Sequence, residues 1–470
     1  MKLKRVMIAA PKSGSGKTTI TCALLQTLKN QGHKVVSYKC GPDYIDPMFH
    51  EQAIGISSKN LDTFFTGEEE TKALLLHNRT EEEFAVLEGV MGLFDGLGGI
   101  RKEGSSYHLA EVTKTPIILT IDAKGMGRSV IPLIAGFLAY DKAHLIQGVL
   151  FNRMSKSYYE VIKPLVESEL QMTVLGYIPD DRALRIESRH LGLVMPDELA
   201  NIKAQLQKMA EVFAKTVSME KMIQIAEHAE ELTGSQTRTA CRLTVGESVT
   251  KREECDRPVI AVAKDEAFCF YYEDNLLLLQ ENGAQIQYFS PLHDTRLPDG
   301  CHALLIGGGY PELYAKELSG NDRMREAVKQ AFERGMPMVA ECGGFMYLHS
   351  AMLDKNGIRH DMAGVIPATC SDQGKLVRFG YIEIKEIQSV FLPEGERIKG
   401  HEFHYYDSTH NGESCVAIKP VTGREYFCVI EGEHYWFGFP HLYYPSHPVF
   451  AKTFVKKAKE YQKRCEGQEC

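Results

Sequence analysis

Short apolar runs alternate with longer amphipathic stretches over the first 200 residues of the chain. This alternation is typical of an α/β domain in which helices cover a parallel sheet. Residues 197–232 carry no strand pattern and are rich in Lys, Glu, Met and Ala, so we expect them to be helical. The expected strands are residues 4–10, 34–38, 84–88, 116–121, 146–151 and 173–177.

A second α/β pattern follows a polar segment, residues 233–256, which we interpret as a linker. From about residue 360, β-branched and aromatic residues increase between glycine turns, which predicts a more antiparallel region before a final basic helix at 451–461. The expected strands of this half are residues 258–263, 285–289, 303–306 and 336–340. The predicted domains are 1–200 and 257–462, joined by a helical segment and linker at 201–256.

Length and composition limit the possible architecture and partners of the protein. The chain has 470 residues, too many for one core, which agrees with two domains. Its net charge of −8 argues against a nucleic acid or an anionic membrane as the main partner. No apolar stretch reaches the length of a bilayer span. The 12 cysteines are scattered and form no C-x-x-C pair, which favours reduced thiols and a cytoplasmic location.

A candidate phosphate-binding loop follows the first expected strand. Gly14, Ser15 and Gly16 allow backbone N–H groups to approach a phosphate closely, and the following helix adds its positive dipole end. Lys17 supplies a positive charge and Thr18 a hydroxyl group for Mg²⁺. The usual G-x-x-x-x-G-K-T motif has glycine where this chain has a proline, so the loop is a K-S-G-S-G-K-T variant. The predicted ATP-binding residues in the loop are Lys12, Gly14, Ser15, Gly16, Lys17, Thr18 and Thr19.

Acidic residues follow several expected strands on the side of this loop, where ligands bind in open α/β sheets. Mg²⁺ prefers one or two carboxylates together with phosphate oxygens. Glu88 and Asp95, after the third strand, are therefore the candidate metal ligands beside Thr18.

Other polar residues after strands have more ordinary explanations. A lone Asp after a strand most often caps a helix or a turn, and we prefer this interpretation for Asp46 and Asp62. Asn152 ends another expected strand. It either contacts the adenine edge of ATP or forms a structural turn.

Cys342 lies between an expected strand and two glycines. Glycines relieve steric conflict in a tight turn, so this setting predicts a nucleophile elbow with cysteine in place of serine. Upstream, Gly308 and Gly309 offer backbone N–H groups for an oxyanion hole. A thiol nucleophile also needs a base. Two histidine-containing segments, 400–404 and 438–444, are the candidates for it.

These motifs together resemble those of the cobyrinate a,c-diamide synthase family, and the resemblance covers nearly the whole chain. The motifs that carry it are residues 14–19, 41–46, 88, 95–96, 122–126, 189–193, 265–272, 307–312, 341–344 and 400–404. The resemblance implies an α/β fold with an N-terminal P-loop NTPase-like parallel sheet of the dethiobiotin synthetase type. It also implies a C-terminal α/β domain like that of class I glutamine amidotransferases.

The resemblance also assigns site residues. His441 matches the catalytic base of glutamine amidotransferases; His404 is the alternative, and His447 is interpreted as a surface or packing residue. The usual triad has a Glu two positions after this His, where this chain has Tyr443, so a Cys–His dyad or an acid from elsewhere is implied. Residues that match Asp43, Glu88 and Asp95 belong to the family's site for ATP, metal and carboxylate activation. Tyr44 and Ile45 are expected beside the macrocycle.

The implied reaction uses ATP, Mg²⁺ and glutamine to amidate the a and c carboxylates of a corrin tetrapyrrole, cobyrinate, through an acyl phosphate. It belongs to cobalamin biosynthesis, and a homodimer is plausible by family likeness. Amidation of nickel-sirohydrochlorin remains open, because a near relative of the family acts on it. Cobyric acid synthase fits less well. A ParA/MinD-like ATPase switch would explain the P-loop but would leave Cys342 and the second domain without a role.

Overall fold

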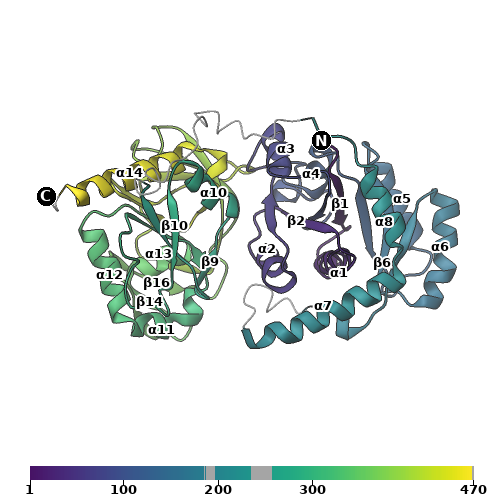
Figure 1. The fold of residues 1–470 in the computed structure, drawn as a ribbon, viewed down its shortest axis with the longest axis horizontal. Coiled ribbons are helices and arrows are strands. Elements are labelled where there is room, and N and C mark those ends of the chain that lie inside the picture. Colours follow the sequence, from purple (N-terminus) through teal and green to yellow (C-terminus); the bar gives the residue numbers. More distant parts are fainter. Residues whose placement is uncertain (185, 187–195, 234–256, 468–470) are drawn as a thin grey trace. The chain divides into compact units, whose positions relative to one another are not determined.

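The computed structural model describes residues 1–184, 186, 196–233 and 257–467. The chain divides into two compact units, Met1–Arg242 and Leu243–Cys470 (Figure 1). The predicted linker, from residue 234 on, and the motif at 189–193 lie outside the described residues. The predicted domain boundaries therefore stay predictions.

The first unit is built on seven parallel strands in the order β3-β2-β4-β1-β5-β6-β7. All six strands predicted for this half form, at nearly the predicted positions. The additional strand, β3, lies at the edge of the sheet and has the sequence SKNL, which gives no apolar run to detect. The strands are β1 (Lys4–Ala9), β2 (Lys34–Cys40), β3 (Ser58–Leu61), β4 (Glu83–Glu88), β5 (Ile117–Asp122), β6 (Ile146–Asn152) and β7 (Val174–Ile178).

Helices cover this sheet. Apolar side chains of α1, α7 and α8 pack with those of β1, β4, β5 and β6 in one buried cluster, and α7 packs against α1 (Figure 1). The segment 197–232, predicted to be helical, contains two helices, α7 and α8, and Ser218 is the N-cap of α8. The helices are α1 (Lys17–Asn30), α2 (Ile45–Phe49), α3 (Glu68–Leu76), α4 (Ser106–Val112), α5 (Val130–Tyr140), α6 (Lys156–Leu170), α7 (Pro196–Thr216) and α8 (Met219–Glu227).

The second unit contains a six-stranded sheet in the order β10-β8-β11-β13-β23-β22. Its strands are parallel except for β22, which pairs antiparallel with β23. A five-stranded antiparallel sheet, β21-β20-β17-β18-β24, accounts for the predicted change of pattern after residue 360. A four-stranded sheet, β15-β14-β16-β19, and the pair β12-β9 complete it.

All four strands predicted for the parallel part of this unit form. They are β8 (Val259–Ala263), β10 (Gln285–Phe289), β11 (Ala303–Ile306) and β13 (Met338–Glu341). The other strands are β9 (Phe268–Phe270), β12 (Gly308–Gly309), β14 (His349–Leu353), β15 (Arg359–Asp361), β16 (Ile366–Asp372), β17 (Arg378–Glu386), β18 (Arg397–His404), β19 (Tyr406–Ser408), β20 (Cys415–Ile418), β21 (Glu425–Cys428), β22 (Ile430–Gly432), β23 (Tyr435–Gly438) and β24 (His441–Leu442).

Helices of the second unit include the predicted basic C-terminal helix, which is longer than expected. They are α10 (Glu273–Glu281), α11 (Ala315–Gly320), α12 (Asp322–Glu333), α13 (Gly343–Leu348) and α14 (Val449–Glu466). The structure thus confirms the predicted fold class of both halves, a P-loop-type parallel sheet and a second α/β domain.

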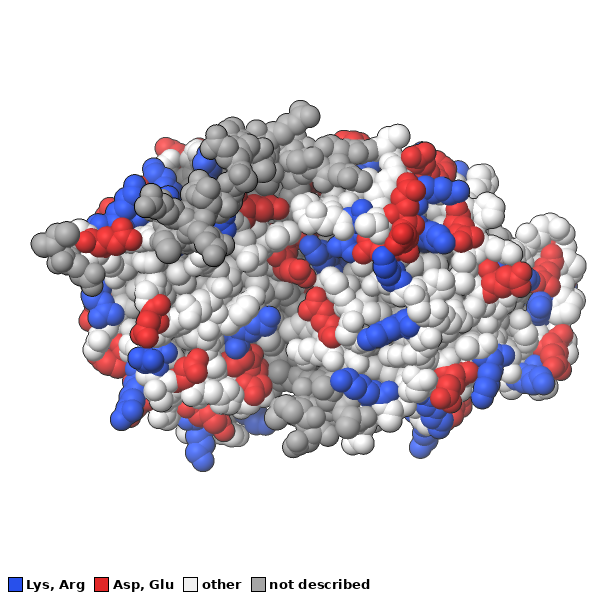
Figure 2. Space-filling model, viewed as in Figure 1, with Lys and Arg blue, Asp and Glu red and all other residues white. Residues whose placement is uncertain are grey.

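Charged side chains are mixed in sign over the face of each unit seen in Figure 2, where lysine and arginine alternate with acidic residues. Among the described helices, none combines the length and the apolar character needed to cross a membrane.

Candidate active sites

The phosphate-binding loop connects β1 to α1, as the motif predicts. Gly14 and Gly16 both have positive φ angles, 73° and 91°, which glycine adopts without strain. A Cβ atom on Gly16 would lie 2.2 Å from Nδ2 of Asn152. That Nδ2 atom donates a hydrogen bond to the carbonyl oxygen of Ser15, at 2.8 Å. Asn152 therefore stabilises the loop through this hydrogen bond, and its contact with adenine stays a prediction.

Lys17 begins α1 and is buried. Its Nζ donates hydrogen bonds to the carbonyl oxygens of Met91, at 2.5 Å, and Lys12, at 3.4 Å. Burial, followed by repulsion from the ammonium of Lys39, lowers the pKa of Lys17 to about 8. The loop thus holds a cation in a poorly solvated place, where an anionic phosphate would restore the favourable environment of the charged form. The side chain of Lys12 is exposed, and Thr19 is half-buried on α1.

Next to the loop, a cluster of polar and charged side chains joins four elements, α1, α2, β2 and β4. Thr18 Oγ1 donates to Glu88 Oε1 at 2.6 Å and lies 3.4 Å from Asp46 Oδ2. Lys39 on β2 contacts the same two carboxylates, Glu88 at 2.8 Å and Asp46 in a shorter ion pair. Asp46 was interpreted from sequence as a cap or turn residue, and that interpretation is wrong. Its carboxylate, in the first turn of α2, joins the cluster through Lys39 and Thr18.

The cluster holds an excess of acceptors. Burial, and then the charge of Asp46, raise the pKa of Glu88 to about 8. Burial lowers the pKa of His50 to about 4, and its Nε2 lies 3.6 Å from Glu88 Oε2. Neither of these two atoms has a hydrogen-bond partner among the described residues. A carboxylate oxygen without a hydrogen-bond partner, next to the hydroxyl of the P-loop, suits Mg²⁺. Thr18 and Glu88 would be its protein ligands.

Two further predicted residues of this site lie at the margin of the cluster, and Asp43 Oδ2 lies 3.9 Å from Lys39 Nζ. Asp43 Oδ1 accepts hydrogen bonds from the backbone N–H groups of Ile45 and Asp46, at 2.8 and 3.2 Å, and burial raises its pKa. Asp95 Oδ2 accepts from Gly92 N at 3.0 Å in its own turn. Mg²⁺ binding by Asp95 thus gains no support from the contacts of Thr18 and Glu88, and it stays a prediction.

The residues expected beside the macrocycle begin α2. Tyr44 is buried, with 7% of its surface exposed, and Ile45 is half-buried. Only a small part of the Tyr44 side chain is therefore open to a ligand. Asp62 caps its own turn, because Oδ1 accepts from Phe64 N at 2.7 Å, as interpreted from the sequence.

Cys342 occupies the sharp turn between β13 and α13. Its φ and ψ angles are 48° and −102°, a rare conformation for a residue with a side chain. Its N–H donates to the carbonyl oxygen of Gly438 on β23, at 2.8 Å. The residue is 7% exposed, and burial raises the pKa of its thiol above the ordinary value. The preceding Glu341 accepts a hydrogen bond from Tyr444 Oη at 3.2 Å, and burial raises its pKa to about 8.

The glycine strand β12 lies against this turn. A Cβ atom on Gly343 would lie 3.1 Å from the backbone nitrogen of Gly309. A Cβ atom on Gly308 would lie 2.4 Å from Cε1 of His441. Glycines therefore allow the turn after the nucleophile, the candidate oxyanion donors and the candidate base to meet. The structure thus brings Gly308 next to His441 and Gly309 next to the residue after Cys342, while the catalytic roles of these residues stay predictions.

His441 is 2% exposed, and burial lowers its pKa to about 3. Its ring stacks on that of His401, with centroids 4.8 Å apart, because the two residues are cross-strand partners on β24 and β18. His401 Nδ1 in turn lies 3.1 Å from Tyr272 Oη. At neutral pH the imidazole of His441 is therefore uncharged, the form that can accept a proton from a thiol.

The position where the usual triad has Glu is filled differently. Tyr443 donates its hydroxyl to Asp274 Oδ2 on α10, at 3.1 Å. The alternative base His404 stacks on Phe439, with centroids 4.0 Å apart, and its Nδ1 lies 2.6 Å from the carbonyl oxygen of Tyr406. His447 contacts Glu396 at 3.2 Å near the surface, as interpreted from the sequence.

Sequence reasoning missed Lys39, His50 and His401. Lys39 and His50 were not recognised because a single polar residue in or after an apolar run gives no motif. His401 belongs to the segment 400–404 that was noted for its histidines. Its pairing with His441 depends on the register of β18 and β24, which the sequence does not reveal.

Comparisons with known proteins agree with this two-site arrangement. Residues 6–194 match the CobQ/CobB/MinD/ParA nucleotide binding domain, and residues 259–433 match the CobB/CobQ-like glutamine amidotransferase domain. The cobyrinate a,c-diamide synthase of Caldanaerobacter subterraneus is 36% identical over 462 residues, 97% of this chain and 99% of the relative. That of Thermoplasma volcanium is 37% identical, over 99% of this chain and 100% of the relative. That of Listeria innocua is 37% identical, over 88% and 90%. The chain belongs to the cobyrinate a,c-diamide synthase family.

Proposed function

We propose that this glutamine-dependent amidotransferase ligase converts the a and c carboxylates of cobyrinate into amides, at the cost of ATP and glutamine. The observation that carries the proposal is the strained turn of Cys342 beside Gly308, Gly309 and His441 in a chain that also has a P-loop. The full-length relatives named as cobyrinate a,c-diamide synthases support the choice of substrate.

The first unit would activate the carboxylate. A carboxylate is a poor electrophile, and transfer of the γ-phosphoryl group of ATP to one of its oxygens gives an acyl phosphate with phosphate as the leaving group. In this chain, Lys17 and the N–H groups of the loop would bind the phosphates. Thr18 and Glu88 would hold Mg²⁺, which supplies positive charge to the phosphates when bound. Asp43, Tyr44 and Ile45 are proposed to lie at the tetrapyrrole.

The second unit would supply nitrogen. The Sγ atom of Cys342 attacks the side-chain amide carbon of glutamine while neutral His441 accepts the thiol proton. The N–H groups of Gly308 and Gly309 would stabilise the oxyanion. The C–N bond breaks with return of the proton to nitrogen, which releases ammonia, and water hydrolyses the remaining thioester to glutamate. Ammonia then displaces phosphate from the acyl phosphate and forms the amide.

Substitution of the nucleophile tests this division of work. The Cys342→Ala variant should lose amidation with glutamine and keep amidation with ammonium chloride, because the first unit is unchanged. The half-buried Cys301 provides a matched control, and Cys301→Ala should keep both activities. Mass spectrometry of cobyrinate after incubation with ATP, Mg²⁺ and either nitrogen source measures the amides formed. Loss of both activities in Cys342→Ala would contradict the proposal, and amidation of nickel-sirohydrochlorin alone would replace its substrate.

A further inference from the structure

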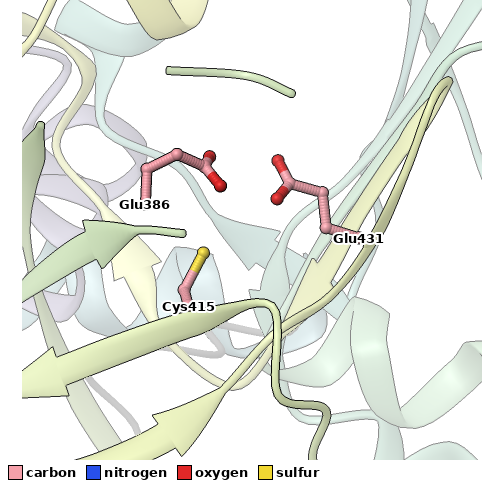
Figure 3. A group of neighbouring side chains, drawn as sticks. All are labelled: Glu386, Cys415 and Glu431. Carbon is pink, nitrogen blue, oxygen red and sulfur yellow. The ribbon is translucent and has the colours of Figure 1, made fainter. Parts of the chain in front are cut away.

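Three side chains outside both candidate active sites form a compact group in the second unit. Glu386 is the last residue of β17, Cys415 is the first residue of β20, and Glu431 lies on β22. One ligand atom from each residue lies within 4.8 Å of the other two. In Figure 3 the two carboxylates face each other, with the sulfur atom beside them.

The group joins two different sheets. Glu386 and Cys415 are cross-strand partners in the five-stranded antiparallel sheet. Glu431 belongs to the edge strand of the six-stranded sheet, where it pairs with Trp436. The three donors therefore meet where these sheets pack, in a region whose other side chains are largely apolar.

The group is buried and rich in negative charge. Glu386, Cys415 and Glu431 are 2%, 1% and 8% exposed. Neither carboxylate oxygen of Glu431 has a hydrogen-bond partner of good geometry within the described part of the chain, although the carboxyl of Glu386 and the backbone N–H of Phe391 lie close enough to influence its pKa. No described lysine or arginine lies within ion-pair distance of Glu386 or Glu431, although the charge of Lys457 on α14 lowers the pKa of Glu431. A buried carboxylate without a partner is costly, so a cation or a proton must compensate it.

We propose that Glu386, Cys415 and Glu431 bind one divalent transition-metal ion, best matched by Zn²⁺. A thiolate with two carboxylates favours Zn²⁺ over Mg²⁺ or Ca²⁺, which prefer oxygen ligands alone. Bonds of about 2.0–2.3 Å to a tetrahedral ion place ligand atoms roughly 3.5 Å apart, so the carboxylates need only small side-chain rotations. The backbone N–H groups of Ile387 and Gln388, which donate to Glu386 Oε1 at 3.1 and 3.0 Å, already orient one ligand.

The ion would tie the two sheets together and need not take part in amide synthesis. A proton competes with it for the same place. Burial, followed by the carboxylate of Glu386, raises the pKa of Glu431 to about 9, and burial also raises the pKa of the Cys415 thiol. Binding of the ion must displace such protons, so the affinity should increase as the pH rises.

Metal binding by the full-length chain tests the site without any activity assay. The chelator-treated protein is dialysed against Zn²⁺ in excess Mg²⁺, which should fill the proposed magnesium site, and the bound zinc is measured by mass spectrometry. We expect about one Zn²⁺ per chain, and roughly 100-fold or greater loss of affinity in Cys415→Ser and Glu431→Gln, since even outer ligands change affinity 10- to 100-fold. No zinc retained by the wild-type protein would overturn the proposal.

Substitution with Co²⁺ reports a thiolate ligand in the wild type and in control variants, so the measurement remains informative even if one ligand variant folds poorly. A thiolate bound to Co²⁺ gives a charge-transfer absorption that carboxylate ligands do not give. The absorption should be present in the wild type, in Cys342→Ala and in Cys428→Ser, whose thiol is buried on the strand next to Cys415. It should be absent in Cys415→Ser. Loss of the absorption in Cys342→Ala would refute the proposal. So would a Glu431→Gln protein that is more stable than the wild type at every Zn²⁺ concentration.

Discussion

Replacement of Lys39 by Met should destabilise the first unit strongly. The ammonium group of Lys39 is buried between Glu88 and Asp46, with 5% of the residue exposed. Methionine has nearly the same length and no charge, so the variant removes the cation and keeps most of the packing. It leaves two carboxylates side by side in the interior, with Asp43 Oδ2 also losing a charge 3.9 Å away.

The size of the effect follows from the burial of the pair. Breaking a buried ion pair by removing one partner costs about 3–5 kcal/mol, because the other charge stays desolvated. Protonation of Glu88 reduces this cost. Acids whose pKa is raised in the folded state bind protons more tightly when folded, so their unfavourable effect grows as the pH rises. The loss in Lys39→Met should therefore be larger at pH 8 than at pH 6.

Two optical signals separate the units in a urea titration. The chain has one tryptophan, Trp436, which is buried in the second unit, so its fluorescence reports that unit alone. Circular dichroism reports both. In Lys39→Met, part of the dichroism change should move to lower urea while the fluorescence transition stays in place. The control is Lys34→Met, on the same strand as Lys39. It removes an exposed ion pair with Glu82 and should leave both transitions unchanged.

Two results would refute this reasoning. Equal stability of Lys39→Met and Lys34→Met would show that the cluster tolerates two neighbouring carboxylates without a cation. A stability loss that does not depend on pH would show that repacking around the methionine, and not charge, is responsible. The double variant Lys39→Met, Glu88→Gln separates charge from repacking. It should recover part of the lost stability if charge is responsible.

Three other predictions concern the two sites. Gly308→Ala places a methyl group against His441 and should lower glutamine-dependent kcat/KM roughly 100-fold while ammonia-dependent amidation persists; equal loss of both activities would argue against it. Asn152→Ala removes the hydrogen bond to Ser15 and should raise the KM for ATP without changing glutaminase activity, and an unchanged KM would show that the loop needs no such support. Burial lowers the pKa of His441 from 6.5 to about 3, so the folded unit binds this proton less tightly than the unfolded chain. Between pH 6.5 and 5 the wild type should therefore lose on the order of 2 kcal/mol relative to His441→Asn, measured by Trp436 fluorescence, and parallel pH profiles would contradict this.

Much of the fold follows from local patterns in the sequence. Buried parallel strands are short apolar runs, and those runs identified β1, β2 and the other strands with predicted positions. The exception, β3, is an edge strand of mostly polar residues, so no hydrophobic signal marks it. The helical character of residues 197–232 was predicted, but the pattern does not show where α7 ends and α8 begins at Ser218, because helix-forming residues continue on both sides of the cap.

The sites divide in the same way. Gly14, Gly16 and Cys342 were found because backbone geometry demands particular residues next to a strand, and that demand is visible in the sequence. Lys39 and Asp46 were missed or misread because their partners lie on other elements. The group of Glu386, Cys415 and Glu431 is the extreme case, since two sheets must pack before its members meet.

Contacts of the backbone, more than partner side chains, determine where the sulfur of Cys342 lies. Its φ of 48° carries strain of about 1–3 kcal/mol, which persists only if the surroundings hold the turn. They do so through hydrogen bonds from Cys342 N to Gly438 O and from Gly344 N to Gly307 O, at 2.8 and 2.9 Å. A Cβ atom on Gly344 would lie 2.0 Å from the carbonyl oxygen of Ile306, so the turn also depends on the absence of a side chain there. Strands β11 and β23 therefore place the nucleophile before glutamine binds, and the free energy that maintains the turn comes from the folding of the sheet.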